Sequence, residues 1–399
     1  MRLLFVHQNF PGQYLRLAAH LAAQSGNEVV GVGEAGNLAQ RREDAPGVTL
    51  RGYEVPAAPS AAPHLDRQNE AWLRGTAVAS GLLEMKRAGY RPDLICAHGG
   101  WGEAGFIKDV FPDSPLLLYC EYFYTGVDLA FDPATFRDSI EDRFRLRWWN
   151  APQLLALDAA DRGITPTQWQ RRQFPEVYQP RISVIHEGID TDALAPVLDG
   201  REEELVTYIA PNLEPYRGFH VFMRALPELQ KRRPKARVVI VGGDASVYSP
   251  PLPGGETWRK RMLRELDGRI DLARVQFIGS LPYGDYVGLL RRSTVHVYLS
   301  YPFVLSWSLL EAMSLGCLVV GSRTPPVEEV IRHGENGLLA DFLSPERIAE
   351  EIDCAIGQQC DLRPVREAAH RTVRERYDFR RVCLPAQLAL HAELLEKSR

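Results

Sequence analysis

The chain has 399 residues, of which 45% are hydrophobic and 25% are charged, and its formal net charge is −4. This length predicts two or three domains that each bury a core, and the composition excludes wholesale disorder. The mildly acidic balance argues against a dedicated nucleic-acid-binding protein, whose affinity comes mostly from neutralising phosphates. No apolar run approaches the roughly 20 residues that span a bilayer.

The start of the chain and its cysteines predict a cytoplasmic protein. The apolar residues 3–6 lack the small-residue cleavage site of a signal peptide, so we expect a first strand there. No C-x-x-C pair occurs, which favours reduced thiols over a disulfide framework or a zinc site. Peripheral contact with the inner membrane face stays open. The six cysteines are Cys96, Cys120, Cys317, Cys354, Cys360 and Cys383.

Short apolar runs alternate with helical patterns along the chain, as is typical of βαβ units and parallel sheets. In the first half we expect a helix at 14–25 and strands at 3–7, 28–32, 48–53, 94–97 and 116–119. In the second half we expect strands at 204–209, 237–241, 275–278, 295–299 and 318–320, with helices at 218–232, 283–291, 308–315 and 326–332. The prediction is an α/β fold with two Rossmann-like, doubly wound domains facing a cleft.

A polar stretch with glycine and proline, residues 188–200, separates the two halves and predicts an interdomain hinge. We therefore expect an N-terminal domain over 1–187, a C-terminal domain over 201–375, and a final helical segment over 376–399. Doubly wound folds bind ligands beyond the carboxyl ends of their strands, beside helix N-termini. Candidate site residues are accordingly sought in the strand-to-helix loops.

The segment 301–316 combines an irregular loop with a helix that a serine caps. Backbone N–H groups near Ser306 and the helix dipole favour a phosphate there. Glu311, one turn into the helix, is placed to accept hydroxyl hydrogen bonds, as from a ribose diol. An ordinary capped helix has the same features, so this segment alone does not decide for a site.

The run Leu310-Glu311-Ala312-Met313-Ser314-Leu315-Gly316 resembles the C-terminal signature of family 4 retaining glycosyltransferases, which have the two-Rossmann architecture called GT-B. The resemblance continues through residues 317–322, 326–331 and 334–339. It departs at Phe303, where the family usually has a first Glu that contacts donor-sugar hydroxyls. Donor-sugar recognition then falls to groups around Leu305, Ser306, Trp307 and Ser308, with altered sugar preference or lost transferase activity as the consequence.

A second motif, residues 210–219, is similar to the family loop whose two cations hold the donor diphosphate. Arg217 and Gly218 fill the second cation position, and an arginine can bind phosphate oxygens bidentately. Pro211 and Asn212 stand where the first cation is expected.

Two glycine-containing strand ends resemble the family loops that border the nucleotide. Gly242 and Gly243 let the backbone approach it closely. The loop with Gly279, Leu281 and Pro282 corresponds to the one beside the base. Both lie in the family's order relative to Arg217 and Glu311.

The first half offers candidates for the acceptor side. Gly12 and Gln13 lie in the first strand-to-helix turn, where Gly12 permits close approach and Gln13 can bond a hydroxyl. His98 ends a predicted strand and matches the family's D-(V/L)-(I/V)-x-x-H motif, which implies contact with the transferred sugar. Glu121 and Tyr122 follow the next strand and are candidates for the acceptor pocket.

Three other patterns have a structural interpretation. The D-x-D of Asp190 and Asp192 lies in the linker, so no metal site is expected. The basic run 231–237 ends a helix and complements its dipole. Arg143, Arg145 and Arg147, with neighbouring tryptophans, suit a lipid surface but are more typical of an amphipathic helix edge.

The resemblance implies a metal-independent, retaining glycosyltransferase of polysaccharide or glycoconjugate synthesis that needs no cofactor. Its co-substrate would be a UDP- or GDP-sugar and its acceptor a carbohydrate, small molecule or lipid-linked molecule. His98, Arg217 and Glu311 are the expected catalytic residues. The last helix is expected to cross back to the first domain. The alternatives are a nucleotide-sugar epimerase of the same fold and a binding protein on a decayed transferase scaffold.

Overall fold

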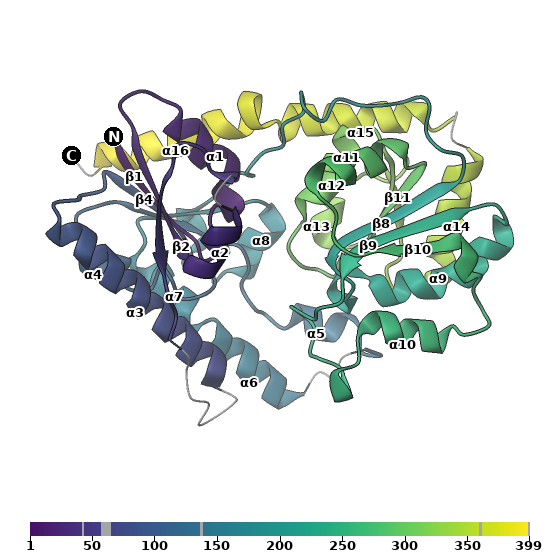
Figure 1. Cartoon of the computed structure of the whole chain (residues 1–399), viewed down its shortest axis with the longest axis horizontal. Coiled ribbons are helices and arrows are strands. Elements are labelled where there is room, and N and C mark those ends of the chain that lie inside the picture. The colour runs from purple at the N-terminus through teal and green to yellow at the C-terminus, as the bar shows by residue number, and fades with distance from the viewer. Residues whose placement is uncertain (42–43, 57–64, 136–138, 359–360, 398–399) are drawn as a thin grey trace. The chain divides into compact units, whose positions relative to one another are not determined.

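The computed structural model describes the 399 residues except 42–43, 57–64, 136–138, 359–360 and 398–399. The chain divides into two compact units (Figure 1). Unit 1 comprises Met1–Val127, Asp138–Gly188 and Phe379–Arg399, and unit 2 comprises Asp128–Arg137 and Ile189–Asp378. The final segment thus belongs to unit 1. A short segment from the first half of the chain, which the linear division at residue 187 does not anticipate, belongs to unit 2.

Unit 1 is built on a seven-stranded parallel sheet with the order β3-β2-β1-β4-β5-β6-β7. The interior strand β1 is apolar and buried along most of its length, as expected for a parallel strand covered on both faces. The strands are β1 (Arg2–Val6), β2 (Glu28–Glu34), β3 (Thr49–Tyr53), β4 (Leu94–His98), β5 (Leu116–Tyr119), β6 (Arg162–Thr165) and β7 (Ile182–Val184).

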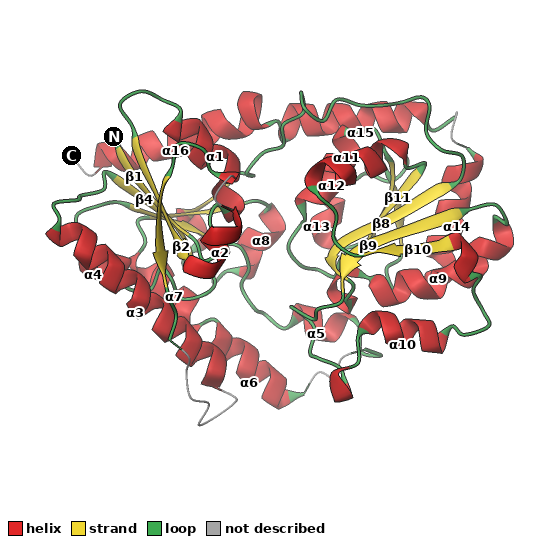
Figure 2. Cartoon of the chain, viewed as in Figure 1, coloured by secondary structure: helices red, strands yellow, loops and turns green. Residues whose placement is uncertain are grey.

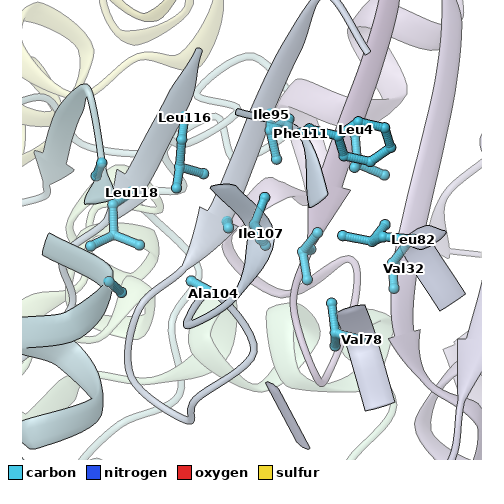
Figure 3. Packing of buried hydrophobic residues seen from close by; sticks show 14 of the residues in the cluster. Leu4, Val32, Val78, Leu82, Ile95, Ala104, Ile107, Phe111, Leu116 and Leu118 are labelled. Atoms are coloured by element: carbon cyan, nitrogen blue, oxygen red, sulfur yellow. The ribbon is translucent and has the colours of Figure 1, made fainter. Parts of the chain in front are cut away.

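Successive residues of β1 point to opposite faces of this sheet, so each face has its own core. Leu3 and Phe5 pack with α1 (Leu15–Ala22) and α16 (Leu384–Lys397). Leu4 packs on the other face with α3 (Asp66–Arg87), α4 (Ile107–Val110) and α7 (Ala151–Ala159), as Figure 3 shows for Val78, Leu82 and Ile107. Further helices of unit 1 are α2 (Ala35–Arg41), α6 (Ile140–Trp149) and α8 (Gln168–Gln173).

Unit 2 is built on a six-stranded parallel sheet with the order β10-β9-β8-β11-β12-β13. Helices cover both sides of this sheet (Figure 2). The strands are β8 (Leu205–Asn212), β9 (Arg237–Gly243), β10 (Val275–Ile278), β11 (Val295–Tyr298), β12 (Leu318–Ser322) and β13 (Leu338–Ala340). The helices are α5 (Val127–Phe131), α9 (Phe219–Arg232), α10 (Trp258–Glu265), α11 (Tyr283–Arg292), α12 (Trp307–Ser314), α13 (Pro325–Glu328), α14 (Pro345–Gly357) and α15 (Arg363–Arg376).

Each sheet has one point where the order of its strands reverses. In unit 1 β1 pairs with β2 on one side and β4 on the other, and in unit 2 β8 lies between β9 and β11. The loops that follow such neighbouring strands diverge and leave a crevice at the carboxyl edge of the sheet, which is where doubly wound folds bind ligands. The loops after β1 and β4, and after β8 and β11, therefore lie beside these crevices.

Within the described residues, no helix combines the length and apolar character needed to cross a membrane. The five cysteines that the structure describes form no disulfide with one another, and Cys360 lies outside the described residues. Burial raises the pKa of the Cys120 thiol to about 12, with a small opposing effect of a backbone hydrogen bond. Buried thiols of this kind are poor nucleophiles at neutral pH.

Candidate functional site

In unit 1, His98 and Glu121 form the centre of a buried polar cluster. His98 is the last residue of β4 and is 1% exposed, and its Nε2 lies 3.3 Å from Oε2 of Glu121, which follows β5. Gln13 donates from its Nε2 to the other oxygen of Glu121 at 2.6 Å. The Gly100 backbone nitrogen lies 3.1 Å from Nδ1 of His98, on the side of the ring away from Glu121. Three residues expected at this site thus lie together.

Two further residues complete this cluster. The ring of His7, which follows β1, lies 4.7 Å from that of His98 between centroids. Glu103 is fully buried, and its Oε1 lies 3.5 Å from Nδ1 of His98 and accepts the Gln8 N–H at 3.4 Å. Neither His7 nor Glu103 was expected as a site residue. His7 directly follows β1, much as His98 ends β4, and Glu103 lies five residues after His98 in a glycine-rich loop; these are the signals that the sequence offered.

The carboxylates and the histidines shift one another's pKa values. Burial lowers the pKa of His98, but Glu103 and Glu121 outweigh burial and raise it to about 9. Burial raises the pKa of Glu103 and of Glu121, but His98 outweighs it, so both stay below the ordinary value. Burial and the neighbouring His98 lower the pKa of His7 to about 4. The cluster therefore holds two ionised carboxylates, and His7 is neutral at pH 7.

Gly12 packs against the His98 cluster, whereas the Tyr122 ring packs with other aromatic rings. Gly12 has a φ of +49°, and a Cβ there would lie 2.7 Å from Nε2 of His7. The Gly12 backbone therefore packs directly against the His7 imidazole. The ring of Tyr122 instead packs with those of Tyr124 and Trp169, at centroid distances of 5.0 and 6.2 Å. Gly12 therefore belongs to the His98 cluster, and the Tyr122 ring belongs to an aromatic group beside it.

In unit 2, Arg217 is a buried cation at the carboxyl edge of the sheet. It is 8% exposed and lies in the loop between β8 and α9. Its Nη1 donates to the Val304 carbonyl at 3.2 Å, and its own carbonyl accepts the Tyr208 hydroxyl at 2.6 Å. Within the described part of the chain, no carboxylate forms an ion pair with Arg217. A buried charge without an opposite charge is costly, so this geometry is suited to an anionic ligand.

A group of aromatic side chains packs beside Arg217. Phe303 is 3% exposed, and the Arg217 guanidinium lies 5.4 Å from its ring centroid and 5.6 Å from that of Tyr248. The rings of Phe303 and Tyr248 are 4.7 Å apart, and Tyr216 contacts Phe303 at 5.2 Å. Where the family resemblance leads one to expect a carboxylate, the structure has a buried ring in cation–π contact with Arg217.

Glu214, which was not expected as a site residue, anchors the loop that carries Tyr248. Its Oε2 accepts three backbone N–H groups, from Val247, Tyr248 and Ser249, at 3.2, 3.0 and 2.9 Å. Glu214 is 1% exposed. A carboxylate bound by several amides is strongly held, so this residue ties the loop after β9 to the loop after β8.

In the loop before α12, most of the backbone N–H groups near Ser306 donate hydrogen bonds within unit 2. The Ser306 N–H donates to the Tyr298 hydroxyl at 2.8 Å, the Ser308 N–H to Oγ of Ser306 at 3.4 Å, and the Leu309 N–H to the Ser306 carbonyl at 3.2 Å. Leu305 is buried in the core, with Trp307 packed against the same cluster. These backbone N–H groups, which were expected to bind a phosphate, therefore already donate within the protein. The positive end of the α12 dipole is still available to attract a phosphate.

Glu311 lies one turn into α12, is 5% exposed, and is held by two tyrosines of α11. Tyr283 donates to Oε1 at 3.0 Å and Tyr286 donates to Oε2 at 2.8 Å. The i, i+3 spacing of these tyrosines places both on one face of α11, directly after Pro282. The Glu311 carboxylate thus faces the loop 279–282.

Backbone hydrogen bonds join the glycine-containing strand ends of unit 2. The Gly242 N–H donates to the Gly279 carbonyl at 3.0 Å, and the Leu213 N–H donates to the Gly243 carbonyl at 2.8 Å. A Cβ on Gly242 would lie 2.7 Å from the Ala210 carbonyl oxygen, so only glycine fits. Gly218 has a φ of +73°, and a Cβ there would lie 2.3 Å from Cβ of Leu299.

The D-x-D pattern has a local role, since Oδ1 of Asp190 accepts the Ala193 N–H at 3.0 Å. Among the residues that the structure describes, no three His, Cys, Asp or Glu side chains are grouped as a metal site would require.

Two family models match consecutive parts of the chain. The first, "Glycosyl transferase family 4 group", matches residues 25–194, and the second, "Glycosyl transferases group 1", matches residues 190–375. Together with the two parallel-sheet units and the polar residues at their carboxyl edges, these matches place the chain in a class. The chain belongs to the family 4 glycosyltransferases, with the GT-B fold.

Curated relatives share part of their length with this chain. A D-inositol 3-phosphate glycosyltransferase of Acidothermus cellulolyticus is 28% identical over 55% of this chain and 51% of its own length. A phosphatidyl-myo-inositol mannosyltransferase of Mycobacterium tuberculosis is 29% identical over 49% of this chain and 50% of its own length. The chain thus spans about half the length of these relatives.

Solved structures share the whole fold. Anabaena HepE in complex with UDP-glucose superposes with a TM-score of 0.71 at 18% identity, covering 98% of this chain and all of that chain. Sucrose-phosphate synthase from Thermosynechococcus elongatus superposes with a TM-score of 0.72 at 17% identity and full coverage of both chains. At such identities the likeness establishes the fold.

Proposed function

We propose that this protein transfers a sugar from a nucleotide-diphosphate donor to an acceptor hydroxyl, with retention of anomeric configuration and without a metal ion. The observation that carries this proposal is Arg217, a buried cation at the reversal point of the unit 2 sheet with no carboxylate partner among the described residues. The chain's family membership and the UDP-glucose bound by HepE support the same donor class.

On this proposal Arg217 binds the donor diphosphate. Departure of the nucleoside diphosphate builds negative charge on its phosphate oxygens, and a preorganised cation stabilises that charge without reorganisation. The positive end of the α12 dipole adds to this field. With the first cation position of the family loop held by Pro211 and Asn212, Arg217 carries most of the charge neutralisation.

The nucleoside would lie along Glu311 and the glycine loops. The Glu311 carboxylate, held by one tyrosine hydroxyl at each oxygen, would accept hydrogen bonds from the ribose diol. Gly242 and Gly243 would border the nucleotide, and Gly279 with Leu281 and Pro282 would border the base.

The His98 cluster would serve the acceptor and the transferred sugar. Ionised Glu121 and Glu103 accept hydrogen bonds, and Gln13 with His98 can donate them, a combination suited to sugar hydroxyls. The names of the relatives motivate an acceptor of the inositol phosphate or carbohydrate class, soluble or lipid-linked. The proposed location is the cytoplasm.

A panel of nucleotides and turnover assays tests this function. UDP, GDP, dTDP and ADP and their sugars are screened by thermal shift, and one nucleotide sugar is expected to raise the melting temperature. Its incubation with acceptors should release nucleoside diphosphate and form a glycoside with the anomeric configuration of the donor. Epimerised sugar without an acceptor would indicate an epimerase, and binding without turnover would indicate a binding protein.

A further inference from the structure

Asp132 comes from the first half of the chain, but its side chain lies in unit 2. It is 3% exposed and directly follows α5, whose last residue, Phe131, packs on Tyr301 with ring centroids 5.1 Å apart. Its Oδ1 accepts the Thr135 N–H at 3.2 Å. A carboxylate is costly to bury unless its oxygens are paired, so the partners of Asp132 indicate what it holds.

One oxygen of Asp132 serves two buried residues. Oδ2 accepts the Tyr301 hydroxyl at 2.6 Å and lies 2.9 Å from Nε2 of His220. Tyr301 is fully buried and His220 is 1% exposed. His220 and Tyr301 hold the pKa of Asp132 far below its usual range despite burial, so the carboxylate is ionised at neutral pH and accepts from both groups.

These two partners lie on either side of Arg217. His220 is in the first turn of α9, three residues after Arg217. Tyr301 reaches Tyr216, the residue before Arg217: its N–H donates to the Tyr216 carbonyl at 3.0 Å, and the two rings stack at 5.0 Å with an interplanar angle of 28°. A single carboxylate is therefore linked to the loop on both sides of the buried cation.

We propose that Asp132 is a positioning residue: by holding Tyr301 and His220 it fixes the loop that presents Arg217, and it thereby sets the affinity for the donor diphosphate. This inference rests on the proposed function, in which Arg217 binds that diphosphate. A segment from the first half of the chain thus completes the phosphate site of unit 2.

The test compares a nucleoside diphosphate with its nucleoside, since only the former reaches Arg217. Calorimetry on the whole 399-residue chain measures UDP, GDP, dTDP and ADP against uridine, guanosine, thymidine and adenosine. Asp132→Asn should weaken binding of the diphosphate about tenfold, as expected for loss of hydrogen bonds to a charged group, and leave nucleoside binding unchanged. Tyr301→Phe, which keeps the stacked ring, should act in the same direction, and the double variant should be no weaker than Asp132→Asn alone, because both act through one contact.

Two controls make the outcomes distinct. Glu265→Gln removes the carboxylate paired with Arg224 of α9, outside the proposed site, and should leave both affinities unchanged. Arg217→Ala tests the proposed function itself. If Arg217→Ala loses diphosphate affinity but Asp132→Asn and Tyr301→Phe do not, the role of Asp132 is refuted and the donor site stands. If Arg217→Ala changes nothing, or none of the four nucleoside diphosphates binds the wild type, both fail. Thermal unfolding verifies that each variant is folded, and should Asp132→Asn not fold, Tyr301→Phe decides.

Discussion

Nε2 of His98 lies 3.3 Å from Oε2 of Glu121, and this contact joins the ends of two neighbouring strands of the unit 1 sheet. Gln13 bonds the other carboxylate oxygen at 2.6 Å, so Glu121 is held from both sides. The orientation of His98 is thereby fixed before any ligand binds. Preorganised polar groups of this kind contribute to catalysis because they need not rearrange during the reaction.

The first prediction concerns His98. His98→Ala should lower kcat by about 10²-fold or more, because a positioned hydrogen-bonding group is lost from the reacting sugar, and it should leave the affinity for the nucleoside diphosphate within twofold. Steady-state kinetics and calorimetry measure the two effects. His20→Ala, in α1 of the same unit, is the matched control and should be inert. Equal loss of nucleotide affinity in His98→Ala would refute the assignment of His98 to the sugar side.

The second prediction concerns Glu311. Glu311→Ala should weaken nucleoside diphosphate binding about tenfold, since a charged acceptor for the ribose diol is removed. The wild type should prefer a ribonucleotide over its 2′-deoxy form, and the variant should lose that preference. Tyr283→Phe keeps the carboxylate and should retain it. A preference that persists in Glu311→Ala would remove this residue from the ribose.

The third prediction concerns Gly218. Gly218→Ala should destabilise the fold by about 2–4 kcal/mol, because the new Cβ overlaps Leu299 and the positive φ is strained for alanine. Gly288→Ala, in α11 with no atom near its Cβ position, should be neutral or stabilising by about 0.5–1 kcal/mol. Urea unfolding measures both. Equal stability of the two variants would contradict the close packing of the Arg217 loop.

The fourth prediction is a dependence of stability on pH. Burial lowers the pKa of His391 to about 4 and that of His296 to about 3, and burial with His98 lowers that of His7 to about 4. Each stays neutral in the fold while the unfolded chain takes up a proton below about pH 6.5, so the free energy of unfolding should fall as pH drops from 6.5 toward 4. His98 has the opposite sign: its raised pKa contributes stability below pH 6.5 that is lost as pH rises through about 9.

His391 provides the test of this pH dependence. His391→Gln should flatten the acid limb of the stability curve by up to about 3 kcal/mol between pH 6.5 and 4, since one buried neutral imidazole is removed. Chemical unfolding at a series of pH values measures the slope. An acid limb as steep as that of the wild type would show that His391 does not titrate as its burial indicates.

Apolar patterning anticipated most of the sheet strands. The expected strands at 116–119 and 275–278 coincide with β5 and β10, because buried parallel strands are short, uniformly apolar runs. The strands β6 and β7 were missed because Arg162 and Ser183 interrupt their apolar patterns, and β13 was missed because it has only three residues. The position of residues 128–137 in unit 2 depends on long-range contacts of Asp132 and Phe131, which no local pattern encodes.

The candidate site could be read only in part from the sequence. Strand ends followed by glycines indicated His98 and Gly242, since this is where a parallel sheet presents its ligand edge. The partners of these residues were not readable: Tyr283 and Tyr286 reach Glu311 from another helix, and Glu214 finds its amides more than 30 residues away. Side-chain partners across the fold follow from packing rather than from spacing along the chain.

Glycosyl transfer itself is the central claim, and one assay tests it most directly. The nucleotide sugar selected by thermal shift is incubated with the protein and acceptors, and release of nucleoside diphosphate is followed together with the NMR signal of the new anomeric proton. We predict release that depends on the acceptor, a glycoside with the donor's anomeric configuration, and loss of both in Arg217→Ala. Release that does not depend on any acceptor, or a product of inverted configuration, would contradict the proposed function.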